Sequence, residues 1–293
     1  MKMLITGAKG QLGSELLCIA KERNCSLGAV DRYYNNSDIM ALDSDDMDIT
    51  DLSAVRSVVR ELRPDIIINT AAYTNVDGCE TYIDTAFRVN ALGARNVAIA
   101  AREAGSKLVH ISTDYVFSGD GNIPYREHDQ TSPRSIYGKT KLLGEEYVRE
   151  FSDKYFIIRT SWLYGKSGKN FVRTILGAAK EKDHLDVVDD QVGSPTNAED
   201  VAYHALKIAM TDEYGLYHCS GNGECSWYEF AIMILKLAGI ECPVIPIKTA
   251  QLGRAAKRPA YSSLDNMMLR CTVGDEMRNW EDAIKHFIKG MQL

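Results

Sequence analysis

A short apolar run passes directly into a glycine-rich turn near the start of the chain, Met3-Leu4-Ile5-Thr6-Gly7-Ala8-Lys9-Gly10-Gln11-Leu12-Gly13. The first four residues predict a strand, and the segment that follows the glycines predicts an amphipathic helix. Glycine permits the tight turn and lets backbone N–H groups approach a pyrophosphate at the helix N-terminus. The spacing differs from the commoner Gly-x-Gly-x-x-Gly pattern, but it serves the same purpose. The turn therefore predicts a dinucleotide-binding site.

The rest of the first two-thirds alternates short apolar runs with helical patterns, which indicates βαβ units and a parallel sheet. The helix expected over 51–62 has apolar residues at helical spacing, a cap at Thr50 or Asp51, and a stop at Pro64. We therefore expect an α/β fold with a Rossmann-type doubly wound parallel sheet. Its strands are expected at 3–6, 27–30, 39–42, 65–69, 107–111 and 155–159.

The pattern changes after about residue 165, where a loop rich in Gly and Lys precedes a helix and then a strand over 186–190. Further on, Ser226-Trp227-Tyr228-Glu229 predicts a capping box that opens a helix to about residue 238. We expect an NAD(P)-binding Rossmann domain over 1–165, to which 195–220 returns. A smaller C-terminal substrate-binding domain is expected over 166–194 and 221–293.

The composition narrows the class of protein. The chain has 293 residues, 45% of them hydrophobic and 25% charged, as in ordinary soluble globular proteins. A net charge of −6 indicates no nucleic-acid partner, and no apolar run approaches the roughly 18 residues of a membrane span. Seven cysteines without a Cys-x-x-Cys pair, and histidines without paired spacing, indicate neither a disulfide framework nor a metal site. We expect a cytoplasmic protein.

Polar and small residues at the expected strand ends indicate where a dinucleotide would lie. The strand over 27–30 is followed by Asp31, which would accept hydrogen bonds from the adenosine ribose and favours NAD. Arg32 would instead meet a ribose 2′-phosphate and favours NADP, so the choice stays open. Asp48-Ile49 is expected against the adenine. The small residues of Asn69-Thr70-Ala71-Ala72-Tyr73 leave room for the cofactor beside the sheet.

Two later segments suggest hydride transfer to a carbonyl: Ser112-Thr113-Asp114-Tyr115-Val116-Phe117 and Tyr137-Gly138-Lys139-Thr140-Lys141. The first follows a strand at its C-terminal end, the edge where doubly wound sheets bind ligands. In the second, a tyrosine and a lysine four residues apart share one helix face. The ammonium is expected to lower the phenol pKa from about 10 toward the useful range. Tyr137 would protonate the carbonyl oxygen, to which Thr113 would also hydrogen-bond.

These residues, with the N-terminal glycines, resemble the extended short-chain dehydrogenase/reductase superfamily. Together with Arg159-Thr160-Ser161-Trp162-Leu163-Tyr164, Asp190-Gln191-Val192-Gly193-Ser194-Pro195-Thr196 and Arg258-Pro259-x-x-Ser262, they resemble the dTDP-4-dehydrorhamnose reductase family over nearly the full length. That family reduces the 4-keto group of dTDP-6-deoxy-L-lyxo-4-hexulose with NADH or NADPH, giving dTDP-L-rhamnose for surface polysaccharides. The resemblance implies the same activity here.

The resemblance also implies a role for each matched residue. Tyr137 would be the general acid, Lys141 its electrostatic partner and a ligand of the nicotinamide ribose, and Thr113 the hydroxyl that polarises the oxygen. The dTDP-sugar would contact Thr113, Asp114, Tyr115, Trp162 and Arg258, the last from a basic cluster of Arg254, Lys257 and Arg258 that suits a diphosphate. The expected cofactor ligands are Gly7, Gly10, Gln11, Leu12, Gly13, Asp31, Arg32, Asp48, Ile49, Ala71, Ala72, Tyr73, Thr74, Tyr137 and Lys141.

Three alternatives stay open. An epimerase or dehydratase would share Tyr137 and Lys141, although dehydrating relatives have an acidic residue where Tyr115 follows Asp114. A non-catalytic NAD(P)-binding regulatory subunit has the same fold. The third alternative is the same chemistry on another dTDP-4-keto-6-deoxysugar. Some members of the family form metal-linked homodimers, for which Glu15 and Glu199 are the counterparts, but we predict no metal from them.

Overall fold

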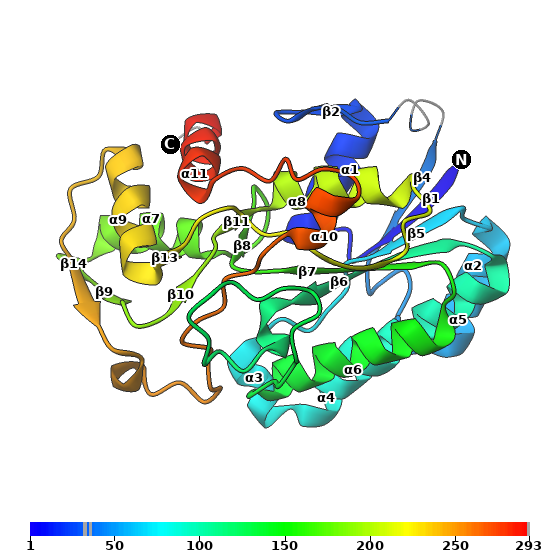
Figure 1. Ribbon diagram of the computed structural model, residues 1–293, viewed down its shortest axis with the longest axis horizontal. Coiled ribbons are helices and arrows are strands. Elements are labelled where there is room, and N and C mark those ends of the chain that lie inside the picture. Colours follow the sequence, from blue (N-terminus) through cyan, green and yellow to red (C-terminus); the bar gives the residue numbers. More distant parts are fainter. Residues whose placement is uncertain (32–33, 35–36, 292–293) are drawn as a thin grey trace.

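The computed structural model of the protein describes residues 1–31, 34 and 37–291, and it has the Rossmann-type α/β fold (Figure 1). Within these residues the central sheet has six parallel strands, in the order β12-β7-β6-β5-β1-β4. The strands are β1 (Lys2–Thr6), β4 (Asp38–Leu42), β5 (Ile66–Asn69), β6 (Lys107–Thr113), β7 (Tyr155–Thr160) and β12 (Gly215–His218).

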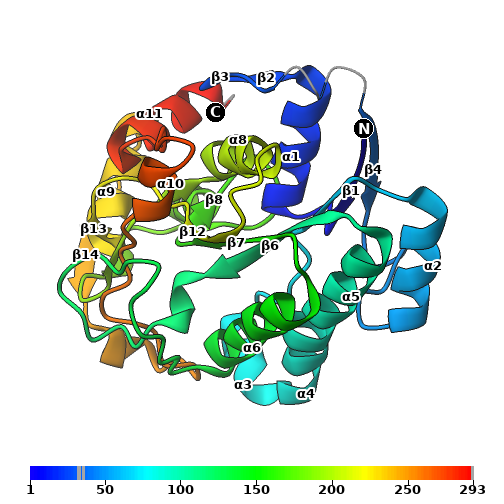
Figure 2. The ribbon, with the colours of Figure 1, turned by 45° about the vertical axis from the view of Figure 1, so that its right-hand side comes forward.

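Helices cover both faces of this sheet (Figure 2). α1 (Gln11–Glu22) and α8 (Ala198–Ala209) pack on one face, and α2 (Leu52–Leu62), α5 (Ala94–Ala104) and α6 (Ile136–Phe151) pack on the other. Successive strand residues face opposite sides, so Ile66 and Ile68 join the first core and Ile67 the second. All three are at most 3% exposed, which explains why this run is uninterruptedly apolar.

The prediction that residues 27–30 form a strand of the central sheet is wrong. Instead β2 (Asn24–Cys25) and β3 (Gly28–Ala29) form a short antiparallel pair outside it, and Gly28 has φ +124°. The place beside β1 belongs to β4, whose Ile39 pairs with Met3. The run over 27–30 contains a glycine in a conformation that strands do not use, whereas the 39–42 run has none. The turn after the strand beside β1 is therefore at residues 43–44.

The C-terminal third builds a second core from three helices and short paired strands. Apolar side chains of α7 (Phe171–Glu181), α9 (Trp227–Ala238) and α11 (Trp280–Gly290) meet there. The predicted capping box is confirmed, since Ser226 and Glu229 bond each other's backbone at the start of α9. The other elements of this third are β8 (Leu163–Tyr164), β9 (Leu185–Val188), β10 (Val192–Gly193), β11 (Thr196–Asn197), β13 (Cys225–Ser226), β14 (Val244–Ile247), η4 (Thr249–Leu252) and α10 (Met267–Cys271). Earlier in the chain lie α3 (Val76–Thr81), α4 (Ile83–Phe87), η2 (Arg88–Gly93) and η3 (Asp114–Val116).

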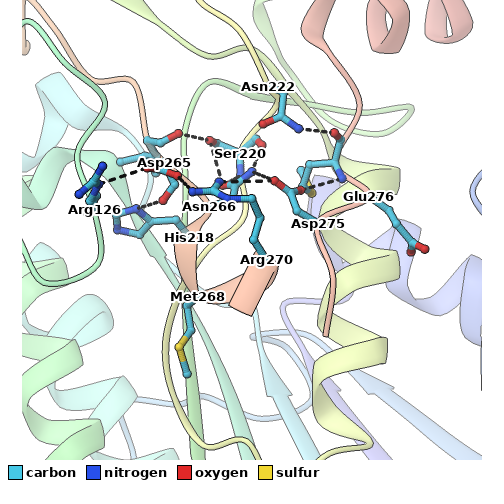
Figure 3. Close-up of polar contacts among 12 residues, drawn as sticks. Arg126, His218, Ser220, Asn222, Asp265, Asn266, Met268, Arg270, Asp275 and Glu276 are labelled. Carbon is cyan, nitrogen blue, oxygen red and sulfur yellow. Dashed lines mark hydrogen bonds and ion pairs between the residues drawn. The ribbon is translucent and has the colours of Figure 1, made fainter. Parts of the chain in front are cut away.

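The segment around α10 is hydrogen-bonded to the end of β12, as Figure 3 shows. Asn266 bonds the backbone of Ser220 with both ends of its amide, at 2.8 and 3.0 Å. His218 Nδ1 lies 3.1 Å from the carbonyl oxygen of Tyr125 and 3.2 Å from that of Asp265. Because these groups are buried or half-buried, the contacts fix the path of the chain that leads from residue 258 to α10.

No helix in the described part of the chain is long and apolar enough to cross a membrane.

Candidate active site

A cavity of about 740 Å³ lies at the C-terminal ends of the central strands. Its wall contains Thr6 from β1, Thr113 from β6 and Thr160 from β7, and it also contains Trp162, beyond the sheet. Doubly wound folds bind ligands at this edge of the sheet, so the cavity is where the fold expects a ligand.

The three residues expected to be catalytic all line this cavity. Ser135 caps α6 by accepting a hydrogen bond from the backbone of Gly138, and this cap fixes the turn that presents Tyr137. A Cβ on Gly138 would lie 2.2 Å from the backbone oxygen of Tyr115, so only glycine lets α6 approach so closely. The phenol of Tyr137 lies within reach of the Thr113 hydroxyl. Lys141 lies one helical turn further on and is 2% exposed.

The expected lowering of the Tyr137 pKa is wrong for this arrangement. Burial raises the pKa of the phenol, and the hydrogen bond with Thr113 opposes this only in part. Lys141 does not relieve it, because its Nζ donates to the backbone oxygen of Ile111 at 2.5 Å. Burial also lowers the pKa of Lys141 to about 8, against a carboxylate at Glu145 that raises it. Tyr137 is therefore protonated at neutral pH, as a proton donor must be.

A buried ion pair beneath Lys141 was missed by the sequence reasoning. Glu145 is fully buried and accepts hydrogen bonds from Arg159 Nε at 2.9 Å and Arg159 Nη2 at 2.7 Å. It also accepts one from Ser112 Oγ at 2.5 Å. The available signals were the four-residue spacing from Lys141 to Glu145 and an arginine inside an apolar strand. The pair ties α6 to β6 and β7 at the level of the cavity floor.

The glycine turn has the geometry that the sequence indicates. Gly7 has φ +68°, and a Cβ there would lie 2.8 Å from the backbone of Ala71. A Cβ on Gly13 would lie 2.3 Å from the backbone oxygen of Gly7, so Gly13 serves the close packing of the turn and does not line the cavity. Gly10 precedes α1 without a side-chain cap. The first N–H groups of α1 therefore face the cavity as an anion site.

Most of the other expected cofactor ligands also line the cavity, namely Gly7, Gly10, Gln11, Leu12, Asp48, Ile49, Ala71, Ala72 and Thr74. Asp43 and Ser44, at the turn after β4, line it as well, although the sequence reasoning did not select them. Their position beside β1 was the available signal.

Two further expected cofactor ligands have a different environment, and a third is not described. Asp31 lines a separate cavity of about 240 Å³, with Tyr203 and Lys207, and the structure does not bring it to the main one. Arg32 lies outside the described residues. The backbone of Tyr73 is bonded to the side-chain amide of Asn90, at 2.8 and 3.2 Å, and Tyr73 does not line the cavity.

The opposite end of the cavity has the residues expected to contact a sugar. Asp114 is buried there, and burial raises its pKa to about 6 while hydrogen bonds with Ser262 and Thr113 lower it. Trp162 stacks on Trp227 with ring centroids 3.5 Å apart and planes 4° apart. Its φ of +45° is rare for a tryptophan, so packing must hold it.

Tyr115 also lines the cavity, and Arg258 lies behind it rather than on the wall. Arg258 Nη1 donates to the hydroxyl of Tyr115 at 3.3 Å, and Nη2 donates to Asp77 at 3.1 Å. Burial raises the pKa of Tyr115 to about 12, with Arg258 opposing. The expected diphosphate ligand is thus one side chain away from the cavity.

The two carboxylates considered for a metal have cationic partners. Glu199 pairs with Arg278 at 3.1 Å and accepts from Ser26 Oγ at 2.7 Å. Glu15 lies 3.6 Å from Lys166 Nζ. Among the residues that the structure describes, no three His, Cys, Asp or Glu side chains form a group that could hold a metal ion.

The comparisons with known proteins agree on one family. The model of the RmlD substrate binding domain matches residues 1–293. A spore coat polysaccharide biosynthesis protein of Bacillus subtilis is 41% identical, over 98% of this chain and 97% of that protein. Two solved dTDP-4-dehydrorhamnose reductases are similar along their whole length. The one from Clostridium acetobutylicum has a TM-score of 0.94 and 45% identity, with 100% of each chain covered. The one from Bacillus anthracis, in complex with NADP, has a TM-score of 0.92 and 44% identity, with 99% of each chain covered.

Proposed function

Since the chain belongs to the RmlD substrate binding domain family, we propose that it reduces the 4-keto group of dTDP-6-deoxy-L-lyxo-4-hexulose with NAD(P)H, giving dTDP-L-rhamnose. The observation that supports this most is the arrangement of one cavity. One part of its wall contains the protonated phenol of Tyr137, the buried hydroxyl of Thr113 and the buried Lys141. Another part contains the glycine turn that suits a dinucleotide.

The reduction needs a hydride at C4 and a proton at the oxygen. Bound NAD(P)H supplies the hydride. The Thr113 hydroxyl, which donates to Asp114 Oδ1 at 2.9 Å in the structure, would turn to donate to the carbonyl oxygen and polarise it. Tyr137 then donates its phenolic proton to the developing alkoxide. Lys141, held by the backbone oxygen of Ile111, stabilises the phenolate that remains. Because burial raises the pKa of Tyr137, the phenol carries its proton at neutral pH and has it available when the alkoxide forms.

We propose these roles for the dinucleotide end. The N–H groups at the start of α1, from Gln11 and Leu12, bind the pyrophosphate, and Ile49 lies against the adenine. The adenosine ribose is recognised at the turn after β4, by Asp43 and Ser44, rather than by Asp31, because ribose recognition belongs to the strand beside β1.

The sugar end and the domain division follow from the same cavity. Trp162 offers an indole face to the apolar side of the deoxysugar, and Asp114 and Tyr115 bond its polar groups. We assign residues 1–165, with 195–220, to the cofactor-binding domain, and 166–194 with 221–293 to the substrate-binding domain. A cytoplasmic homodimer remains our proposal for location and assembly, and light scattering after size-exclusion chromatography tests the dimer.

A related sugar nucleotide is the second candidate. The similarity to a dTDP-4-keto-6-deoxy-D-glucose reductase of Streptomyces niveus, 36% identical over 97% of this chain and 95% of that protein, favours the same chemistry on another dTDP-4-keto-6-deoxysugar. The stereochemistry of the product depends on how the sugar is placed in the cavity, within fractions of an ångström. We assign the control of this placement to Trp162 and Asp114.

The test is an absorbance assay of NADH and NADPH oxidation with a panel of dTDP-4-keto-6-deoxysugars. We expect net cofactor consumption, which an epimerase would not give, with the highest kcat/KM for dTDP-6-deoxy-L-lyxo-4-hexulose. Tyr137→Phe should lower kcat at least about a hundredfold and leave cofactor binding intact. Cofactor binding by the wild type without oxidation in the presence of any of these sugars would refute the reductase and favour a regulatory subunit.

A further inference from the structure

Asp77, at the start of α3 (Val76–Thr81), connects the cofactor half of the molecule to the segment at residues 254–258. One carboxylate oxygen accepts hydrogen bonds from Arg254 Nη1 at 3.2 Å and Arg258 Nη2 at 3.1 Å. The other accepts one from the backbone N–H of Ala256 at 3.1 Å. One carboxylate therefore holds two guanidinium groups that would otherwise repel each other.

These contacts continue to the catalytic centre. Arg258 donates its other terminal nitrogen, Nη1, to the Tyr115 hydroxyl at 3.3 Å. The ring of Tyr115 packs edge-on against the ring of Tyr137, with centroids 5.4 Å apart and planes 78° apart. Arg258 Nε is buried and has no partner among the described residues. Each terminal nitrogen of Arg258 carries a second N–H, and the side chain is 23% exposed, so these N–H groups remain for a further anion.

The chain immediately after this segment, at residues 259–262, is anchored independently of Asp77. Tyr261 donates its backbone N–H to the oxygen of Gly119 at 3.0 Å, and Ser262 donates to the oxygen of Val192 at 2.8 Å. A Cβ on Gly119 would lie 2.3 Å from Pro259, so the two loops are in close contact there. Residues 254–258 are held by Asp77 through the Ala256 N–H and the two arginines, and the 51% exposed Arg254 side chain remains accessible.

We propose that Asp77 is a positioning residue for the diphosphate of the nucleotide sugar: it orients Arg254 and Arg258 so that their free N–H groups meet the phosphates beside Tyr115. This inference rests on the proposed function for the identity of the nucleotide. It assigns Asp77 no contact with the ligand, since a carboxylate would repel a diphosphate. Asp77 acts only through the two arginines.

Binding of dTDP to the full chain, measured by calorimetry, tests this role without turnover. We expect Asp77→Asn to raise the Kd for dTDP about fivefold, because the arginines lose the charge that orders them. The Kd for NADPH should not change. The matched control is Asp153→Asn, since Asp153 pairs with Arg102 at 3.0 Å and does not line the cavity. An unchanged Kd for dTDP in Asp77→Asn would overturn the proposal, and so would a lower Kd, which would make Asp77 a competitor of the diphosphate.

A double-mutant cycle shows whether Asp77 acts through Arg258. In the Arg258→Gln background, Asp77→Asn should change dTDP binding much less than in the wild type. An equal effect in both backgrounds would contradict the proposed route. In turnover, Asp77→Asn should raise KM for the sugar nucleotide and leave kcat nearly unchanged. If the wild type binds dTDP but reduces no 4-keto sugar, the proposed function fails while the role of Asp77 stands. If it does not bind dTDP, the role of Asp77 fails.

Discussion

A single carboxylate at the dinucleotide end controls the choice between NADH and NADPH in our interpretation. Asp43 lines the cavity at the turn after β4 and already accepts the backbone N–H of Lys9 at 3.0 Å. A carboxylate there accepts hydrogen bonds from ribose hydroxyls and repels a 2′-phosphate.

We therefore expect Asp43→Ala to shift the ratio of kcat/KM for NADPH over NADH upward by at least about fivefold. Steady-state kinetics with both cofactors measure this ratio. Asp31→Ala is the control, because Asp31 lines a different cavity. The assignment of the ribose site would be wrong if Asp31→Ala shifted the ratio and Asp43→Ala did not.

Glu145 affects both stability and pH dependence, because it is the buried partner of Arg159 and lies near Lys141. Glu145→Gln leaves Arg159 as a buried, unpaired charge and should lower the free energy of unfolding by about 3 kcal/mol in urea titrations. The carboxylate raises the pKa of Lys141, so its removal lowers that pKa further below about 8.

Activity that needs the Lys141 ammonium should then be lost at a lower pH, which the alkaline limb of a kcat/KM profile measures. Glu146→Gln is the matched control, since Glu146 is the exposed neighbour. An alkaline limb unchanged in Glu145→Gln would show that the carboxylate does not act on Lys141.

At the scale of elements, β10 supports the tryptophan stack that closes the sugar end. A Cβ on Gly193 would lie 2.6 Å from the Trp162 indole and 2.9 Å from Ser262 Oγ. We expect Gly193→Ala to displace Trp162 and to raise KM for the sugar nucleotide about tenfold, with an unchanged Kd for NADPH.

Gly177→Ala is the control for this variant, because Gly177 lies within α7 and has no atom within 4 Å of its added Cβ. It should stabilise the protein by up to about 1 kcal/mol and leave KM unchanged. An unchanged KM in Gly193→Ala would show that the position of Trp162 does not limit sugar binding.

The elements differ in how well the sequence predicts them. β1, β5 and β7 each contain a run of at least three apolar residues between helical patterns, and such runs have few alternatives to a buried parallel strand. The run at 27–30 has a similar composition, but the strand that pairs with β1 on that side is β4. Local patterns specify a strand; they do not specify its neighbour.

The residues of the candidate site also differ in how well the sequence predicts them. Thr113, Tyr137 and Lys141 follow strand ends or share a helix face, so local spacing finds them. Asp77 bonds Arg258 across 181 positions of the chain, which no local pattern reveals. The prediction of a lowered pKa for Tyr137 was wrong, because this pKa depends on burial and on the direction of the Lys141 side chain. Both are properties of the folded molecule.

At the scale of the whole molecule, buried histidines should make the fold sensitive to acid. Burial lowers the pKa of His110, His204 and His218, the last to about 3, with Arg159 also lowering it. As the pH falls below about 6.5, these histidines become protonated in the unfolded chain but stay neutral in the folded chain. The free energy of unfolding therefore decreases. Asp114 and Glu127 have the opposite effect, since burial raises the pKa of both carboxyls, that of Asp114 to about 6, but they are two groups against three.

The free energy of unfolding should therefore fall by at least about 1 kcal/mol between about pH 7 and pH 5. Urea titrations at several pH values measure it. His218→Asn should flatten the dependence, because the variant removes one group whose protonation is coupled to unfolding. Equal stability at both ends of this range would contradict the neutral, buried state of these side chains.

The overlap of Trp162 and Trp227 also has an optical consequence. The chain has three tryptophans, and the third, Trp280, packs in the second core against Phe230. Two indoles face to face at 3.5 Å couple their intense transitions, so the pair should produce a paired positive and negative band in far-ultraviolet circular dichroism. A sugar that slides against Trp162 would change that band and the fluorescence, while Trp280 supplies a constant background. Ligand entry is thus observable in the unlabelled protein, before any hydride moves.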